Sequence, residues 1–329
     1  MAAGGGSPGG LAALRAGAQL LHRPERLAPV ELVRRLGAVQ AQDVRAFPLA
    51  LRARAEGLTA AAVAKAPGLV RTWLMRSTLH LVPEEDAAWL RSLLAPRGAA
   101  ISRRRLGQLG FTEHDADRAV GLVREAIPCT RSDVAAVLER HGLPCTGQAP
   151  VHLLFRAAAE GVLVLGLDDR VLPAPAAGPA PADPAVELAR RHLASRAPAR
   201  PEDLASWSGL PVGVARAAWR ELDVVELGGG WALRGREPAP VRRDLVRLLP
   251  AFDELLLGWK GREHAVAPEH ARDVLPGGGM LRATVTVGGR VAGTWTRAGV
   301  ELWEPVDPAA LERELAEIRA WGADAPDEL

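Results

Sequence analysis

The sequence predicts a mainly helical α+β fold divided into several tandem units, and three observations predict it. The 329-residue chain is longer than one hydrophobic core normally supports. A run of helices followed by a pair of short β segments occurs three times along it. After about residue 245 the pattern changes to alternating apolar residues with glycine turns. Helices followed by a hairpin are typical of a winged helix-turn-helix unit, so we expect three such units and a small C-terminal antiparallel β unit.

The first winged helix is expected over residues 11–83. Helical periodicity occurs in "SPGGLAALRAGAQLL", "APVELVRRLGAV" and "TAAAVAKAPG", and "LVRTWLMRSTLHLV" reads as strand. Residues 84–128 follow with the pattern of connecting helices. The second winged helix is expected over residues 129–175, with a hairpin in "VLVLGLDDRVLPA". Its first helix begins in a capping arrangement of Thr130 and Asp133.

An Ala/Pro-rich linker over residues 176–183 separates the second unit from the third. The third winged helix is expected over residues 184–240, where three helical segments precede the hairpin "VVELGGGWALRG". The C-terminal unit is expected over residues 241–329, with a turn at Gly288-Gly289 and a closing helix in "PAALERELAEIRAWG". Residues 1–10 are predicted to be a flexible tail.

The composition excludes several classes of protein. Apolar residues make up 48% of the chain and charged residues 24%, which is typical of a globular protein and not of a disordered one. No apolar run reaches the ~18 residues of a membrane span, and the N-terminus lacks a secretory signal, so we expect a cytoplasmic monomer without membrane contact. Cys129 and Cys145 are expected to be reduced thiols, because no Cys or His spacing suits a metal. Neither a metal nor a cofactor is expected.

Charge is distributed unevenly along the chain. Residues 1–160 contain 21 Lys and Arg against 14 Asp and Glu, and the remainder contains 20 against 25. The basic half would attract a polyanion such as DNA, although a solvated basic face is the simpler alternative. The candidate phosphate ligands, held as a group, are Arg34, Arg35, Arg45, Arg71, Arg76, Arg103, Arg104, Arg105, Lys260 and Arg262.

Gln40 and Gln42 stand two residues apart in "LGAVQAQDVRAFPLALRAR". Residues two apart point to nearly opposite faces of a helix but to the same face of an extended chain. If the two amides act together, the preceding helix must therefore end near them. Pro48 favours this, because it pushes Phe47 away from helical backbone angles. The alternative is a surface helix with solvated polar residues.

Four blocks together resemble a known family: "VQAQD", "RTWLMRSTLHLVP", "LLPAFDELLLGWKGRE" and "LRATVTVGGRVAGTW". They are similar to the winged-helix AlkZ-like and YcaQ-like DNA glycosylases over about residues 10 to 325. The resemblance implies three tandem winged helices around a duplex and hydrolysis of the N-glycosidic bond of N7-alkylated purines, including bulky adducts and interstrand crosslinks. It also implies a role in self-resistance to DNA-alkylating natural products. The family's catalytic signature is matched here by Gln40, Ala41 and Gln42.

Two amides suit the implied chemistry. An N7-alkylated guanine is positively charged, so it leaves as a neutral base and needs little help from a general acid. What remains is to hold a water against C1′ and to stabilise an oxocarbenium-like sugar. Two amide oxygens can accept hydrogen bonds from that water. Because Lys65 and Lys260 are the only lysines, a Schiff-base lyase step is not expected and the product would be an intact abasic site.

Other polar residues are given supporting roles. Asp43 could support the site, but in extended chain it points away from Gln42, which favours a structural role. His80 alternates with apolar neighbours on an expected strand, so it is either a packed core histidine or a site-supporting residue. Asp253 is expected to organise a turn. The rival functions are a catalytically silent winged-helix DNA binder or transcription regulator, and a nonenzymatic lesion sensor.

Overall fold

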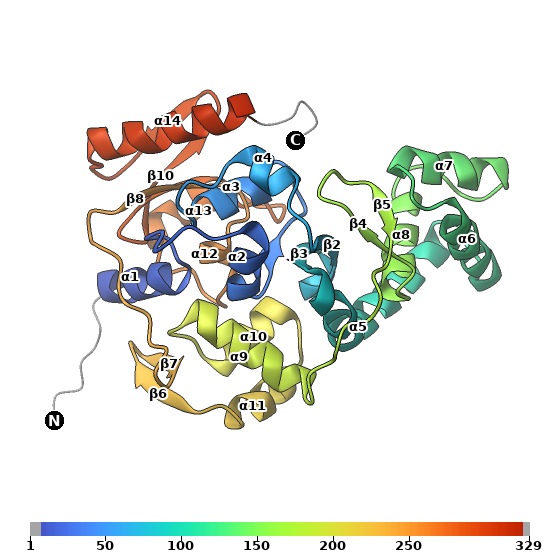
Figure 1. Cartoon of the computed structure of the whole chain (residues 1–329), viewed down its shortest axis with the longest axis horizontal. Helices are drawn as coiled ribbons and strands as arrows, with labels where there is room; N and C mark the ends of the chain where they lie inside the picture. The colour runs from blue at the N-terminus through green and yellow to red at the C-terminus, as the bar shows by residue number, and fades with distance from the viewer. Residues whose placement is uncertain (1–7, 325–329) are drawn as a thin grey trace. The chain divides into compact units, whose positions relative to one another are not determined.

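The computed structural model describes residues 8–324, and the chain divides into two compact units (Figure 1). Unit 1 combines the N-terminal segment up to Ala66 with the chain from Ala185 onward, and unit 2 is Pro67–Pro184. The predicted tail over residues 1–10 lies mostly outside the described residues, and the first helix begins at Pro8. None of the helices in the described part has the length and apolar character needed to span a bilayer.

The N-terminal part of unit 1 is a set of short helices around one very short strand. Its elements are α1 (Pro8–Ala18), α2 (Pro29–Leu36), β1 (Val39–Gln40), α3 (Phe47–Arg52) and α4 (Ala60–Ala64). Proline in the first turn favours the start of α2 and of α3, where its missing N–H needs no partner. The Thr59 hydroxyl accepts the Ala62 N–H and so caps α4, which lies in a segment predicted to be helical.

The second part of unit 1 has the predicted order of three helices and a hairpin. Its elements are α9 (Pro184–Arg196), α10 (Pro201–Ser208), α11 (Val212–Arg220), β6 (Val224–Leu227) and β7 (Gly230–Leu233). Gly228 and Gly229 form the hairpin turn with φ of 55° and 79°, a conformation that residues with a Cβ rarely adopt.

The C-terminal part of unit 1 confirms the predicted β unit with a closing helix. Its elements are β8 (Val246–Leu249), α12 (Glu254–Leu257), the 3₁₀ turn η3 (Pro268–His270), α13 (Ala271–Val274), β9 (Thr284–Val287), β10 (Arg290–Thr296), β11 (Gly299–Leu302) and α14 (Pro308–Asp324). The strands form one antiparallel sheet in the order β11-β10-β9-β8, and the β9–β10 turn is Gly288-Gly289 as predicted. Leu311, Leu315 and Ile318 of α14 pack against the core of this sheet.

In unit 2 the hairpins expected in two separate wings share one sheet. The strands are β2 (Leu69–Trp73), β3 (Leu79–Pro83), β4 (Leu163–Leu165) and β5 (Val171–Pro173). They lie in the order β3-β2-β4-β5, and Arg71 of β2 pairs with Leu165 of β4. Asp169 makes the β4–β5 turn with φ of 69°, within the segment predicted as a hairpin.

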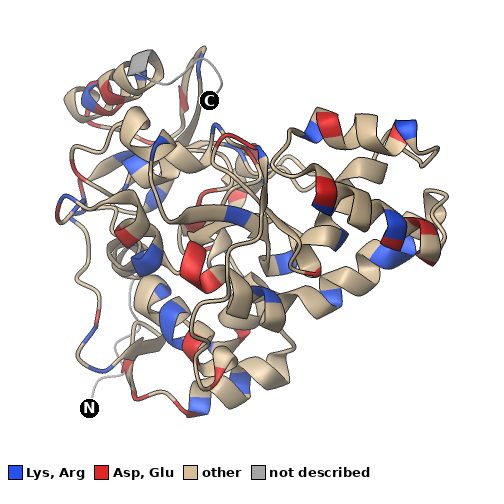
Figure 2. Ribbon diagram, turned by 45° about the vertical axis from the view of Figure 1, so that its right-hand side comes forward, with Lys and Arg blue, Asp and Glu red and all other residues tan. Residues whose placement is uncertain are grey.

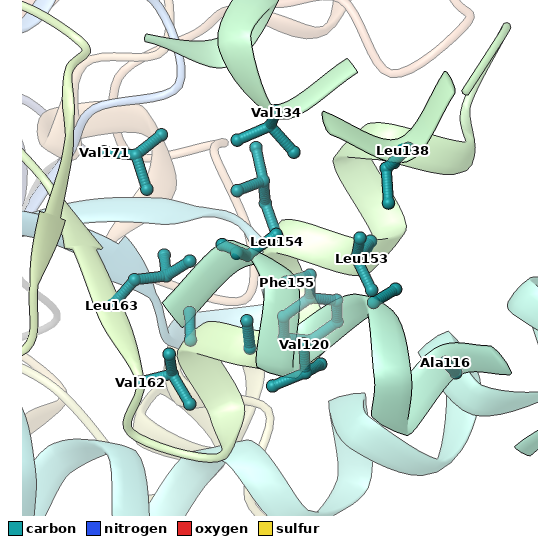
Figure 3. Packing of buried hydrophobic residues seen from close by; sticks show 14 of the residues in the cluster. Ala116, Val120, Val134, Leu138, Leu153, Leu154, Phe155, Val162, Leu163 and Val171 are labelled. Atoms are coloured by element: carbon teal, nitrogen blue, oxygen red, sulfur yellow. The ribbon is translucent and has the colours of Figure 1, made fainter. Parts of the chain in front are cut away.

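Four helices surround the hydrophobic core of unit 2 (Figure 3). They are α5 (Ala87–Gln108), α6 (Glu113–Ala126), α7 (Arg131–Arg140) and α8 (Ala149–Ala159), and two 3₁₀ turns, η1 (Met75–Ser77) and η2 (Glu84–Asp86), precede them. Thr130 and Asp133 form the predicted capping box at the start of α7. Leu153, Leu154 and Phe155 of α8 lie in the centre of the core with Val120 of α6 and Val134 of α7.

The mixture of helices and small antiparallel sheets confirms the predicted α+β class. The boundary between the two units falls at Ala66–Pro67, inside the segment predicted as the first winged helix. The helices of that segment are in unit 1, and its hairpin β2–β3 is in unit 2. The division of the chain into three winged-helix units therefore stays a prediction.

Candidate active site

The two glutamines follow the end of α2, as their spacing predicts. Helix α2 ends at Leu36, and Gly37 reverses the chain with φ of 79°, which only glycine adopts without strain. The chain is then extended through Val39 and Gln40 in β1, and Gln42 lies in the bend that follows. The interpretation of this segment as a solvated surface helix is wrong, because the helix has ended before either amide.

Gln40 and Gln42 differ in exposure and are joined by a hydrogen bond. Gln40 is 7% exposed, whereas Gln42 is exposed. The backbone N–H of Gln42 donates to the Gln40 side-chain oxygen Oε1 over 3.4 Å, a long contact. The Gln40 amide oxygen is therefore directed toward Gln42, and it keeps a second lone pair for another donor.

A buried carboxylate holds the backbone of Gln40. Glu254 Oε1, in the first turn of α12, accepts the Gln40 N–H over 2.9 Å. Its other oxygen, Oε2, accepts from Arg196 Nη2 over 2.5 Å and from Trp207 Nε1 over 3.0 Å. Both ends of the Glu254–Arg196 ion pair are buried, so every hydrogen bond they make is needed to offset desolvation.

Arg196 binds backbone carbonyl groups of the same segment. Its guanidinium donates to the Leu36 carbonyl over 2.8 Å and to the Ala38 carbonyl over 3.3 Å, and it lies 4.1 Å from the centre of the Trp207 ring. The pair thus fixes one backbone N–H and two backbone carbonyls between the end of α2 and the first glutamine. Charge-assisted hydrogen bonds of this kind are stronger than neutral ones.

A second buried ion pair contains Asp253, the residue that precedes Glu254 in the sequence. Asp253 accepts from both terminal nitrogens of Arg54, over 2.7 and 2.8 Å. Asp253 also accepts the Leu255 N–H over 2.9 Å and so caps α12, which confirms that it organises a turn. Gln19 extends the network, because its oxygen accepts from Arg54 over 3.0 Å and its nitrogen donates to the Ser195 carbonyl over 2.6 Å.

Glu254 and Arg196 are the residues that sequence reasoning missed. The available signal was the pair of adjacent acids in "AFDELLLGW", because carboxylates in an apolar stretch are buried only when they are paired. The partner could not be identified from the sequence, since 58 residues separate Glu254 from Arg196 and 214 separate it from Gln40.

Asp43 has the structural role favoured by its position. Its carboxylate accepts the Arg45 N–H over 2.8 Å, and its carbonyl accepts the N–H groups of Ala46 and Phe47. These bonds form the turn that leads into α3. Arg45 is exposed, with its Nε 3.6 Å from the same carboxylate.

His80 lies in unit 2, on β3. It is fully buried, and its Nδ1 lies 3.0 Å from the Thr78 carbonyl oxygen. This is the environment of a packed, hydrogen-bonded histidine. Its predicted role in supporting the site stays a prediction.

The predicted phosphate ligands differ in how far their side chains are exposed. Most are on the surface, and Figure 2 shows Lys and Arg along the ribbons of both units. The exposed side chains are those of Arg34, Arg35, Arg45, Arg76, Arg103, Arg104 and Lys260. Arg105 and Arg262 are half-buried, and burial lowers the pKa of Arg262.

Arg71 does not fit that set. It is 0% exposed, and its Nη1 donates to Asp169 over 2.9 Å and to the Gly166 carbonyl over 3.3 Å. Burial lowers its pKa, and the neighbouring Asp169 carboxylate opposes that shift. A guanidinium in this position holds the β4–β5 turn and cannot reach a phosphate, so the prediction for Arg71 is wrong. The alternation of β2 gave no indication of this, because both faces of the strand are buried.

Within residues 8–324, no group of three or more His, Cys, Asp or Glu residues is arranged to hold a metal ion. The polar groups described around the two glutamines are amides, backbone groups and the buried ion pair of Glu254 with Arg196.

Comparison with known proteins agrees with the sequence resemblance. The family model for DNA glycosylase AlkZ-like proteins matches residues 33–323. The chain is 27% identical over 331 residues to an interstrand DNA cross-link repair glycosylase from Streptomyces sahachiroi, covering 88% of this chain and 89% of that protein. The solved structure of Streptomyces sahachiroi DNA glycosylase AlkZ has the same fold, with a TM-score of 0.79 at 23% identity over 97% of this chain and 98% of that one.

Proposed function

The chain belongs to the DNA glycosylase AlkZ-like family, and from this premise we propose that it hydrolyses the N-glycosidic bond of N7-alkylated purines in duplex DNA. Bulky adducts and interstrand crosslinks are included in the proposed substrates. The relative from Streptomyces sahachiroi is named as an interstrand cross-link repair glycosylase, which supports this breadth. A role in self-resistance to a DNA-alkylating natural product is the corresponding biological proposal.

The observation that supports the mechanism best is the hydrogen bond between the two glutamines. The Gln42 N–H reaches the Gln40 amide oxygen, so the extended chain brings the second glutamine to the amide of the first. We propose that the two amide oxygens accept hydrogen bonds from one water and direct its lone pair at C1′. The bond from C1′ to N9 breaks as the water oxygen attacks, the electron pair of that bond goes to the base, which leaves without its positive charge, and the attacking water releases one proton to the solvent.

Amides are poor bases, and this fits a substrate whose leaving group is already activated. Protonation of the departing base is unnecessary when N7 is alkylated, so the protein has to position the water and stabilise the charge on the sugar. An unmodified purine would not be excised at a useful rate by such a site. The chain has only two lysines, Lys65 and Lys260, and both are exposed, so the proposal includes no Schiff-base step.

The experiment uses a duplex that contains a single N7-methylguanine. Wild-type protein, Gln42→Ala and a matched control, Gln108→Ala, are incubated with it, and alkali reveals abasic sites. Gln108 is also exposed but lies on α5, with its oxygen bonded to Arg105. We expect strand cleavage with the wild type and the control, and at least a tenfold slower reaction with Gln42→Ala.

Two results would contradict the proposal. Equal excision by wild type and Gln42→Ala would remove Gln42 from the mechanism. No excision of N7-methylguanine or of a bulkier N7 adduct by the wild type, with duplex binding retained, would favour the catalytically silent DNA binder.

A further inference from the structure

Five arginines line one hollow of about 480 Å³ in unit 1. Two come from the last turn of α2, two from α9, and one from the turn after β7; they are Arg34, Arg35, Arg190, Arg191 and Arg236. The other lining residues are small or apolar except for Glu31. Segments far apart in the sequence therefore direct guanidinium groups into the same space.

Acidic residues on the same helices orient these side chains. On α2, Glu31 accepts from Arg34 over 2.8 Å and from Arg35 over 3.1 Å. On α9, Glu187 accepts from Arg190 and Arg191, each over 2.7 Å. These are pairs three and four residues apart on one helix, a spacing at which Glu and Arg side chains meet. Arginine binds phosphate, like carboxylate, through charge-assisted and often bidentate hydrogen bonds, so a phosphate can share these guanidinium groups.

The hollow has more positive than negative charge. Its lining contains five arginines and one acidic residue, Glu31, and the described pairs also bring Glu25 and Glu187 to these arginines. An anionic ligand with several oxygens would neutralise the excess positive charge. The chain's proposed substrate, duplex DNA, presents a phosphate with that chemistry at every nucleotide.

Helix α9 connects the hollow directly to the segment with the two glutamines. The Ser195 hydroxyl donates to the Leu36 carbonyl over 3.1 Å, at the end of α2. A Cβ placed on Gly37 would lie 3.5 Å from the Cβ of Arg191, so the backbone at Gly37 passes close to α9. The same helix ends at Arg196, which holds the carbonyls before Gln40.

The segment beside the hollow is close to the amides in the sequence. Gln40 is the third residue after Gly37, and the backbone over that length spans at most ~11 Å. Successive phosphates of one strand advance about 3.4 Å along the duplex axis, so ~11 Å corresponds to about three base pairs. We propose that this hollow binds a backbone phosphate of duplex DNA within about three base pairs of the excised base, and so sets the register of the lesion. The inference depends on the proposed function for the identity of the DNA.

The first test measures the salt dependence of binding to an undamaged duplex by fluorescence anisotropy. The test variant is Arg34→Ala with Arg190→Ala, because both side chains are partly exposed and lie on different helices. The matched control is Arg242→Ala, whose side chain is exposed and paired with Asp244 outside the hollow. In a plot of log K against log salt, we expect the slope to become shallower by about 0.9 for each phosphate that the variant no longer binds.

The second test locates the phosphate. Single methylphosphonate linkages, which are uncharged, are placed one at a time along a duplex with one N7-methylguanine. For the wild type we expect weaker binding for at least one linkage within about three nucleotides of the lesion. The double variant should lose this sensitivity, whereas Arg242→Ala should keep it.

The outcomes separate the inference from the proposed function. A double variant with the wild-type salt slope and methylphosphonate sensitivity would overturn the hollow as a phosphate site, even if excision is normal. Conversely, a shallower slope and the absence of a methylphosphonate effect in the double variant would support the site even if no base is released. Binding by the wild type that is weakened equally at every linkage position would overturn the proposed register.

Discussion

Glu254 accepts the backbone N–H of Gln40 across 214 residues of sequence, over 2.9 Å, while its other oxygen is bonded to Arg196. The position of the first glutamine is therefore set by a buried ion pair formed by distant segments of the sequence. Arg196 completes this arrangement by holding the Leu36 and Ala38 carbonyls. The sequence blocks with "VQAQD" and "LLPAFDELLLGW" meet at this pair.

Replacing Glu254 by Gln should strongly destabilise unit 1. The substitution leaves the Arg196 guanidinium buried without its counter-charge, and breaking such a pair typically costs about 3–5 kcal/mol. Urea denaturation followed by tryptophan fluorescence measures the change, because Trp207 lies in the same network. Glu202→Gln is the control, since Glu202 pairs with Arg216 on the surface and should matter by under about 1 kcal/mol. Equal effects of the two variants would contradict this account of the ion pair.

The two glutamines should respond differently to alanine. Gln42 is exposed, so Gln42→Ala should change the free energy of unfolding by less than about 0.5 kcal/mol while lowering the excision rate by roughly 10²-fold. Gln40 is buried and accepts the Gln42 N–H, so Gln40→Ala should lower the rate and also cost about 1 kcal/mol of stability. Single-turnover excision and urea denaturation of both variants measure this split. A large loss of stability with Gln42→Ala would show that its role is structural.

Local sequence signals were sufficient for much of the fold. Thr130 with Asp133 and the glycines at 288–289 each determine backbone geometry within a few residues, and the helix start and the turn are found where these signals indicate. The expectation that Pro48 keeps Phe47 away from helical backbone angles is wrong, because α3 begins at Phe47 and accommodates the proline in its first turn. Burial and long-range pairing have no such local signal. Arg71 alternates along β2 like a surface residue but is buried, because the sheet is covered on both faces.

The absence of a local signal for long-range contacts also explains why the sequence identified only part of the candidate site. Gln40 and Gln42 could be identified from their spacing and from a family motif. Glu254 and Arg196 act on them only through contacts between distant segments, which depend on how α9 and α12 pack. The arginines of α9 are not among the phosphate ligands predicted from the sequence for the same reason, since their relation to Arg34 and Arg35 appears only in the folded chain.

Acid should destabilise unit 1 through two buried histidines. Burial lowers the pKa of His192 well below its usual 6.5, with Arg196 adding to the shift, and burial followed by Arg15 lowers the pKa of His264 to about 3. His264 is therefore neutral in the folded chain near pH 5, whereas histidines of the unfolded chain take up protons below about pH 6.5. The lowered pKa of His192 acts in the same direction. Because the unfolded state then binds more protons, stability falls as the pH is lowered from about 6.5 toward the folded-state values.

The change expected for His264 is about 2 kcal/mol between pH 7 and pH 5. Urea denaturation at a series of pH values should show a shallower loss in His264→Gln than in the wild type. His114→Gln is the control, because His114 is exposed on α6. If His264→Gln retains the full loss between pH 7 and pH 5, the assignment of this acid sensitivity to His264 is wrong.

Arg71 should matter for folding and not for DNA affinity. Its guanidinium is buried and bonded to Asp169 and to the Gly166 carbonyl, which lie on the β4–β5 turn. Arg71→Met keeps much of the side-chain volume but leaves the carbonyl and the carboxylate without this donor, at a cost of about 1–3 kcal/mol. Thermal denaturation should show this loss, while the slope of log K against log salt for duplex binding should equal that of the wild type. A shallower slope in Arg71→Met would mean that the side chain leaves its buried position to contact phosphate, and would restore Arg71 to the set of DNA ligands.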